Sequence, residues 1–193
     1  MSETLEPAIP DRLDHQAERL MHKLCDKELT IATAESCTGG MLAALLTDIE
    51  GAGHGFERGF VTYTKDSKAE LLGIPRDLLD RNEAVSEIVA RAMADGALAR
   101  SPADIALAVT GFAGPAGPGH EEGLVHMALA QRGRETVHRV EHFGAIGRGE
   151  VRVKSLETML DMLEHALEGR AGELDARSHD VRIFFPRERF KLK

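Results

Sequence analysis

The feature of this chain that most restricts its fold is the alternation of short apolar runs with segments of helical periodicity. The strand-like runs are residues 29–34, 60–64 and 105–109, and the last is continuously apolar, which suits a buried strand. Helical spacing of apolar residues is found over 11–27, 41–49, 67–72, 85–99 and 151–167. Strands that alternate with helices form units in which the helices cover the faces of a parallel sheet. The sequence therefore predicts an α/β fold.

Two further strand-like runs follow one another without a helix between them. They occupy residues 124–130 and 136–143, and Arg132-Gly133-Arg134 supplies a turn. We expect an antiparallel pair there. The prediction is a single three-layer domain over residues 1–168, with a mostly parallel mixed sheet flanked by helices. The polar residues 169–193 are interpreted as a C-terminal extension.

Composition argues against several classes of protein. The net charge is −8 at pH 7, and the chain has no Trp and one Tyr, so we expect no nucleic-acid partner. No run reaches the roughly 18 apolar residues that a membrane span needs, so no membrane partner is expected. The two cysteines do not form a disulfide framework, and no secretory signal is visible. We therefore expect a cytoplasmic protein.

The first candidate site is the segment Glu35-Ser36-Cys37-Thr38-Gly39-Gly40, between a predicted strand and a predicted helix. The first amides of a helix lack partners and carry partial positive charge, and glycines allow close approach to them. Such a turn can hold a phosphate, present a nucleophile, or do both. The alternative is that Ser36 serves only as a helix N-cap.

The second candidate group follows the predicted strand at residues 60–64. Lys68 can take the proton of a serine if burial lowers its pKa, and Tyr63 can relay or orient that proton. The alternative is that Lys65 and Lys68 are solvated residues at a helix start, which is the usual place of lysine.

Two further segments are candidates for ligand binding. The Gly- and Pro-rich loop from Thr110 to Gly119 follows the most apolar strand, and ligands of α/β sheets bind beyond strand carboxyl ends. Arg148 and Arg152 are spaced to share one helix face, and guanidinium groups suit phosphate or carboxylate. The alternatives are a plain connecting loop and surface ion pairs of the arginines with Glu150 or Glu141.

His138-Arg139-Val140-Glu141-His142 has the spacing of a zinc-protease motif, which requires a helix. The flanking residues indicate a strand, where Glu141 points away from both histidines. We therefore expect no metal site.

Four segments of the chain together resemble the CinA C-terminal domain family. They are Ala34-Glu35-Ser36-Cys37-Thr38-Gly39-Gly40, Val61-Thr62-Tyr63 with Lys68, Ala84-Val85-Ser86-Glu87, and Thr110-Gly111-Phe112-Ala113-Gly114-Pro115. The resemblance runs from about residue 11 to residue 167. It implies an α/β fold, a homo-oligomer and hydrolysis of the carboxamide of nicotinamide mononucleotide (NMN), without a cofactor.

The resemblance also implies roles for individual residues. Ser36 is the expected nucleophile, and Tyr63 and Lys68 complete the expected catalytic group. The expected substrate-binding residues are Cys37, Thr38, Gly39, Gly40, Thr110, Gly111, Ala113, Gly114, Arg148 and Arg152. The expected partner is a small nucleotide substrate.

The chain departs from the family pattern around the expected pocket. Glu83 stands in place of a glycine, Glu121-Glu122 in place of Lys-Pro, and Gly147 in place of an acidic residue. Added acid near a phosphate weakens its binding by repulsion. The alternative function is therefore a catalytically silent protein that binds nucleotides or another protein.

Overall fold

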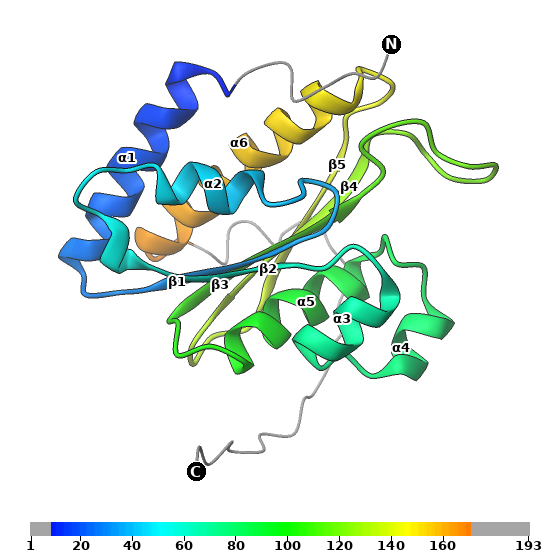
Figure 1. Ribbon diagram of the computed structural model, residues 1–193, viewed down its shortest axis with the longest axis horizontal. Helices are drawn as coiled ribbons and strands as arrows, with labels where there is room; N and C mark the ends of the chain where they lie inside the picture. The colour runs from blue at the N-terminus through cyan, green and yellow to red at the C-terminus, as the bar shows by residue number, and fades with distance from the viewer. Residues whose placement is uncertain (1–8, 171–193) are drawn as a thin grey trace.

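The computed structural model describes residues 9–170, so the proposed extension lies almost wholly outside the described residues. Its centre is a five-stranded sheet in the order β2-β1-β3-β4-β5 (Figure 1). The strands are β1 (Ile31–Glu35), β2 (Phe56–Val61), β3 (Ile105–Gly111), β4 (Leu124–Gln131) and β5 (Val137–His142). The helices are α1 (Asp11–Asp26), α2 (Met41–Thr47), α3 (Lys65–Leu72), α4 (Arg76–Arg81), α5 (Glu87–Ala99) and α6 (Arg148–Leu167), with a short 3₁₀ helix, η1 (Gly53–Gly55).

The sheet is mixed, as predicted. β1 pairs in parallel with β2 and β3, whereas β4 pairs antiparallel with β3 and β5. In the described sheet β4 therefore runs against the other strands. The carboxyl ends of β1, β2 and β3 meet at one edge, which is where α/β sheets place ligands.

Two helical layers cover the sheet (Figure 1). α1, α2 and α6 lie on one face, and α3, α4 and α5 lie on the other. Residues of β3 alternate between the two cores, with Ile105 and Leu107 facing the first group and Ala106 facing the second. The prediction of three layers in one α/β domain is confirmed.

A glycine brings α3 against α5. A Cβ added at Gly96 would lie 2.4 Å from the carbonyl oxygen of Leu72, so any larger residue would push the end of α3 away. This close approach holds α3, which carries Lys68, over the sheet. Gly96 thereby helps to position a candidate site residue that lies far from it in sequence.

The structure differs from the sequence prediction after β2. The predicted strand at residues 60–64 ends at Val61, because Thr64 instead caps α3. Its side chain accepts a hydrogen bond from the Ser67 amide, and the Ser67 side chain accepts from the Thr64 amide. The predicted helix therefore starts at Lys65, earlier than expected. Ser86 caps α5 as predicted.

α4 was not predicted from the sequence, because its six residues are mostly charged and show no helical apolar stripe. Within residues 9–170, no helix combines the length and the apolar character needed to cross a membrane.

Candidate active site

A serine and a lysine from separate elements meet inside the protein. Ser36 follows β1, and Lys68 lies on the inner side of α3 with its side chain 1% exposed. Lys68 Nζ lies 3.0 Å from Ser36 Oγ and donates to the Thr62 carbonyl oxygen at 2.8 Å. Burial lowers the pKa of Lys68 to about 8, close enough to neutrality for proton exchange. The interpretation of Lys68 as a solvated residue is wrong.

The neighbouring cysteine has the opposite electrostatics. Cys37 is buried, and burial raises the pKa of its thiol to about 12. A thiol with that pKa stays protonated at neutral pH and is a poor nucleophile. Of the two adjacent side chains, Ser36 is thus the better candidate, and Cys37 can contact a substrate only through its backbone.

The turn that carries Ser36 is closed by a carboxylate. Glu35 is fully buried, and its oxygens accept hydrogen bonds at 2.7–3.0 Å from the Thr38 hydroxyl and from three amides. Those amides belong to Gly40, Leu42 and Ala43 at the start of α2. Glu35 therefore satisfies the helix terminus itself, and the expected anion site at this terminus is already filled. Sequence reasoning assigned Glu35 no role, although an acid beside a helix start is a recognised cap signal.

Few backbone amides of the turn after Ser36 are available to bind a ligand. The Gly39 amide donates to the Ser36 carbonyl oxygen, and the Gly40 amide donates to Glu35. Among residues 9–170, neither the Cys37 amide nor the Thr38 amide donates a hydrogen bond to another residue, although the Cys37 amide contacts the Cys37 thiol. The expectation that the whole Cys37–Gly40 segment donates to a substrate therefore narrows to these two groups. Gly39 and Gly40 instead provide the turn, with φ of 65° and 100°.

Two arginines of α6 flank the same turn. Arg152 Nε donates to the Cys37 carbonyl oxygen at 2.9 Å, and a Cβ added at Gly39 would lie 3.8 Å from Arg152 Nη2. Arg148 lies against the glycine loop, where a Cβ at Gly114 would be 3.4 Å from its Nη1. Burial first, and then the charge of Arg148, lower the pKa of Arg152.

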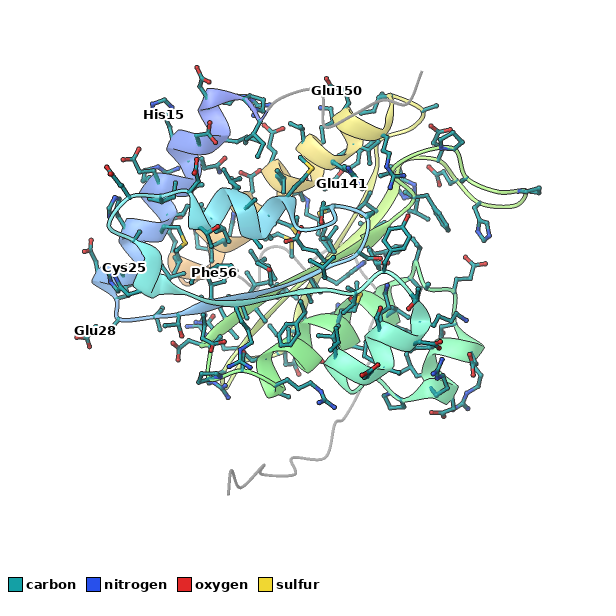
Figure 2. The ribbon with its side chains drawn as sticks, in the orientation of Figure 1. His15, Cys25, Glu28, Phe56, Glu141 and Glu150 are labelled. Atoms are coloured by element: carbon teal, nitrogen blue, oxygen red, sulfur yellow. The ribbon has the colours of Figure 1, made fainter. Side chains whose placement is uncertain are left out.

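Arg148 and Arg152 do not form the surface ion pairs with Glu150 or Glu141 that the sequence left open. Glu141 binds Arg139 instead, at 2.6 Å, and Glu150 is exposed in the first turn of α6 (Figure 2). In the part of the chain that the structure describes, neither Arg148 nor Arg152 has a carboxylate partner. Two half-buried cations without a counter-ion make a site suited to an anion.

Other predicted site residues have structural partners. The Thr110 hydroxyl donates to the Ala84 carbonyl oxygen at 2.8 Å, and Ala113 is buried. A Cβ at Gly111 would lie 2.8 Å from the Leu124 carbonyl oxygen, so the glycine there serves strand pairing. These three residues thus have structural roles, whereas Gly114 of the same loop lies against Arg148.

Tyr63 is not inserted between the serine and the lysine. Its side chain is 65% exposed, and only its carbonyl oxygen approaches Lys68 Nζ, at 3.5 Å. Because Lys68 reaches Ser36 directly, the expected relay through Tyr63 is unnecessary in this arrangement. The phenol lies near enough to Arg152 to interact with its charge, so Tyr63 borders the anion site.

The acidic residues of the rim face histidines. Glu83 lies 3.5 Å from His120, and Glu121 lies 2.9 Å from His142. The His120 ring also packs on Phe112, with ring centres 4.7 Å apart. These contacts give the rim acids local partners and hold the loop to its surroundings.

The histidine motif lies on strand β5, as predicted. Its two histidines have different neighbours, since His138 is buried 3.0 Å from His126 and His142 faces Glu121. No group of three or more metal-ligating side chains in residues 9–170 is arranged to hold an ion.

Comparison with known proteins identifies the family of this chain. The family model described as CinA C-terminal domain matches residues 13–167. A CinA-like protein of Akkermansia muciniphila is 53% identical over 115 residues, which are 58% of this chain and 28% of that protein. A CinA-like protein of Syntrophus aciditrophicus is 45% identical over 146 residues, which are 75% of this chain and 34% of that protein. The chain therefore matches only a minor part of the length of these curated relatives.

Solved structures show the same fold over nearly their whole length. The crystal structure of the competence/damage inducible protein CihA from Agrobacterium tumefaciens has a TM-score of 0.79 at 42% identity. The match covers 83% of this chain and 98% of that one.

Proposed function

The chain belongs to the CinA C-terminal domain family, and on this premise we propose that it is a nicotinamide-nucleotide amidohydrolase. It hydrolyses the carboxamide of NMN to nicotinic acid mononucleotide and ammonia. The observation that carries the proposal is the 3.0 Å contact between Lys68 Nζ and Ser36 Oγ inside the protein. Among residues 9–170, Lys68 has no acidic partner. A lysine buried in this way is costly for stability, but it supplies a base for a nucleophilic hydroxyl.

The first half of the reaction forms an acyl-enzyme. Ser36 Oγ attacks the carboxamide carbon while Lys68 Nζ accepts the hydroxyl proton. The carbonyl electron pair moves to oxygen, and the Cys37 and Thr38 amides donate to this oxyanion. The C–N bond then breaks, and Lys68 gives its proton to the leaving nitrogen, which departs as ammonia.

The second half hydrolyses the ester on Ser36. Water attacks the ester carbon while Lys68 Nζ accepts its proton. The bond from carbon to Ser36 Oγ breaks, and Oγ takes the proton back from Lys68. Nicotinic acid mononucleotide leaves as the carboxylate. These steps return both side chains to their starting states and use no metal ion or cofactor.

Recognition of the nucleotide rests on the anion site. Arg148 and Arg152 bind the phosphate, and Gly39 and Gly114 leave room for it because a side chain at either position would approach a guanidinium. Tyr63 borders the same site. The homo-oligomer and the cytoplasmic location remain predictions.

Ammonia release from the purified full chain tests the function. NMN should release ammonia, whereas nicotinamide, which has the same carboxamide without the ribose phosphate, should release little. NAD provides a second comparison, because its nicotinamide ribose carries a diphosphate. No release from NMN by folded protein would refute the proposal.

One observation favours the second candidate function, a catalytically silent protein that binds a nucleotide. Glu83 and Glu121 place two carboxylates on the rim that their histidine partners neutralise only when protonated. A silent protein would bind NMN without releasing ammonia, which calorimetry and the ammonia assay together distinguish. The buried Lys68 argues against a silent protein. A buried charge lowers the stability of the fold, and a protein that only binds its ligand has no use for a base beside Ser36.

A further inference from the structure

Arg152 touches both the anion site and the turn that carries the nucleophile. We infer that Arg152 couples phosphate binding to the oxyanion-binding peptide beside Ser36, so that the substrate's phosphate accelerates the chemical step as well as binding. The inference rests on the proposed function and assigns Arg152 the role of a positioning residue in it.

The contact with the turn fixes the direction of one amide. Arg152 Nε donates to the Cys37 carbonyl oxygen, and that carbonyl belongs to the same peptide unit as the Thr38 amide. In a trans peptide the two groups point in opposite directions. Holding the carbonyl toward Arg152 therefore holds the Thr38 N–H toward the other side, where an oxyanion formed at Ser36 can accept from it.

The opposite side of this peptide is anchored independently. The Thr38 hydroxyl donates to Glu35 at 2.7 Å, and Glu35 is fully buried in its network with α2. The peptide is thus held by a rigid contact from Glu35 and by an adjustable one from Arg152, whose side chain is half-buried. Only the second of these contacts can respond to a ligand.

The charges at the anion site indicate how a ligand would strengthen that contact. Arg148 and Arg152 share one face of α6 and repel each other, and burial together with Arg148 lowers the pKa of Arg152. Arg152 keeps its contact with the Cys37 carbonyl oxygen against this repulsion, which weakens its hold on the turn. A phosphate between the two removes the repulsion and holds Arg152 against the Cys37 carbonyl.

Coupling through Arg152 affects kcat, whereas simple binding of the phosphate affects only KM. If phosphate contributed only uniform binding, a substrate without phosphate would show a higher KM and an unchanged kcat. Coupling through Arg152 predicts instead that kcat falls when phosphate is missing. It also predicts that a separate anion in the same site restores part of the loss.

Nicotinamide riboside with added phosphite tests this coupling. For the full-length protein we expect kcat with the riboside to be roughly 10- to 100-fold below that with NMN, the scale of a weakened oxyanion donor. Phosphite should raise kcat for the riboside. In Arg152→Lys, the activation by phosphite should disappear, because an ammonium group cannot serve phosphate and carbonyl in the same fork-like way.

Arg132→Lys is the matched control. Arg132 Nε also donates to a backbone carbonyl, that of Ala103 at 2.8 Å, but at the other end of the sheet. This variant should lose some stability and keep the phosphite activation. Equal kcat values for NMN and the riboside, or full activation in Arg152→Lys, would overturn the inference.

A probe of Ser36 separates this inference from the proposed function. Phenylmethylsulfonyl fluoride modifies nucleophilic serines without any nucleotide, and phosphite should accelerate its reaction with Ser36 in the wild type but not in Arg152→Lys. If NMN is not hydrolysed and this acceleration is still observed, the proposed function fails and the coupling stands. If NMN is hydrolysed and phosphite changes neither reaction, the coupling fails alone.

Discussion

Replacing Lys68 by methionine should abolish catalysis while changing how stability depends on pH. The pKa of Lys68 falls from an ordinary 10.5 to about 8 because the side chain is buried. At about 1.4 kcal/mol per pH unit, this difference corresponds to roughly 3 kcal/mol. Because the folded state binds the proton more weakly than the unfolded state, protonated Lys68 costs that free energy below pH 8.

The sign of the effect follows from the two pKa values. Between about pH 8 and pH 10.5 the unfolded chain holds more protons than the folded one, so stability rises with pH in that window. Relative to Lys68→Met, the wild type should therefore gain roughly 3 kcal/mol from pH 7.5 to pH 10.5. Other titrating groups affect both proteins equally and cancel in the difference.

Losses in the variant partly offset the gain at neutral pH. Methionine removes the hydrogen bonds to Ser36 and to the Thr62 carbonyl oxygen, and each costs about 0.5–1.5 kcal/mol. At pH 7 we therefore expect Lys68→Met to be as stable as the wild type or slightly more stable. Urea unfolding of both proteins at several pH values measures the difference. A difference that does not change with pH would refute the claim that Lys68 is buried with a lowered pKa.

Three further predictions follow from the site. The value of kcat/KM for NMN should rise about tenfold per pH unit below pH 7 and level off above about pH 8, as Lys68 loses its proton; a profile that falls through this range would contradict Lys68 as the base. Glu35→Gln should lower the free energy of unfolding by about 2–4 kcal/mol in urea titrations, because it replaces a carboxylate that accepts four hydrogen bonds; Asp104→Asn is the control, since Asp104 accepts bonds from Thr30 at the other end of β1. Tyr63→Phe should change kcat for NMN by less than about tenfold, because the phenol does not lie between Ser36 and Lys68; a loss of about 100-fold or more, the range of a proton-transfer group, would restore the relay.

Much of the fold could be predicted from periodicity. The central strand β3 has a continuous apolar run, with large residues on one face and Ala106 on the other. The pair β4 and β5 was visible because a short turn separates two strand-like runs. The end of β2 was misplaced because Tyr63 and Thr64 are strand-favouring residues, whereas the Thr64 cap acts at the level of hydrogen bonds.

The candidate site was only partly visible in the sequence. Motif spacing drew attention to Ser36 and Lys68, but the burial of Lys68 depends on packing between α3 and the sheet, which no local pattern reveals. The role of Glu35 was missed for a related reason. A carboxylate at the end of a strand is ordinary, and only the three-dimensional turn shows that its oxygens receive the α2 amides. The same turn explains why fewer amides are available to a ligand than the sequence indicated.

The most direct test of the account compares two single substitutions at adjacent residues. Ser36→Ala and Cys37→Ala each remove one candidate nucleophile and change the volume of the turn little. With NMN as substrate, ammonia release should vanish in Ser36→Ala and continue in Cys37→Ala, because the Cys37 thiol stays protonated. Circular dichroism and urea unfolding establish that both variants are folded. Turnover that survives in folded Ser36→Ala and disappears in folded Cys37→Ala would contradict the assignment of Ser36 as the nucleophile.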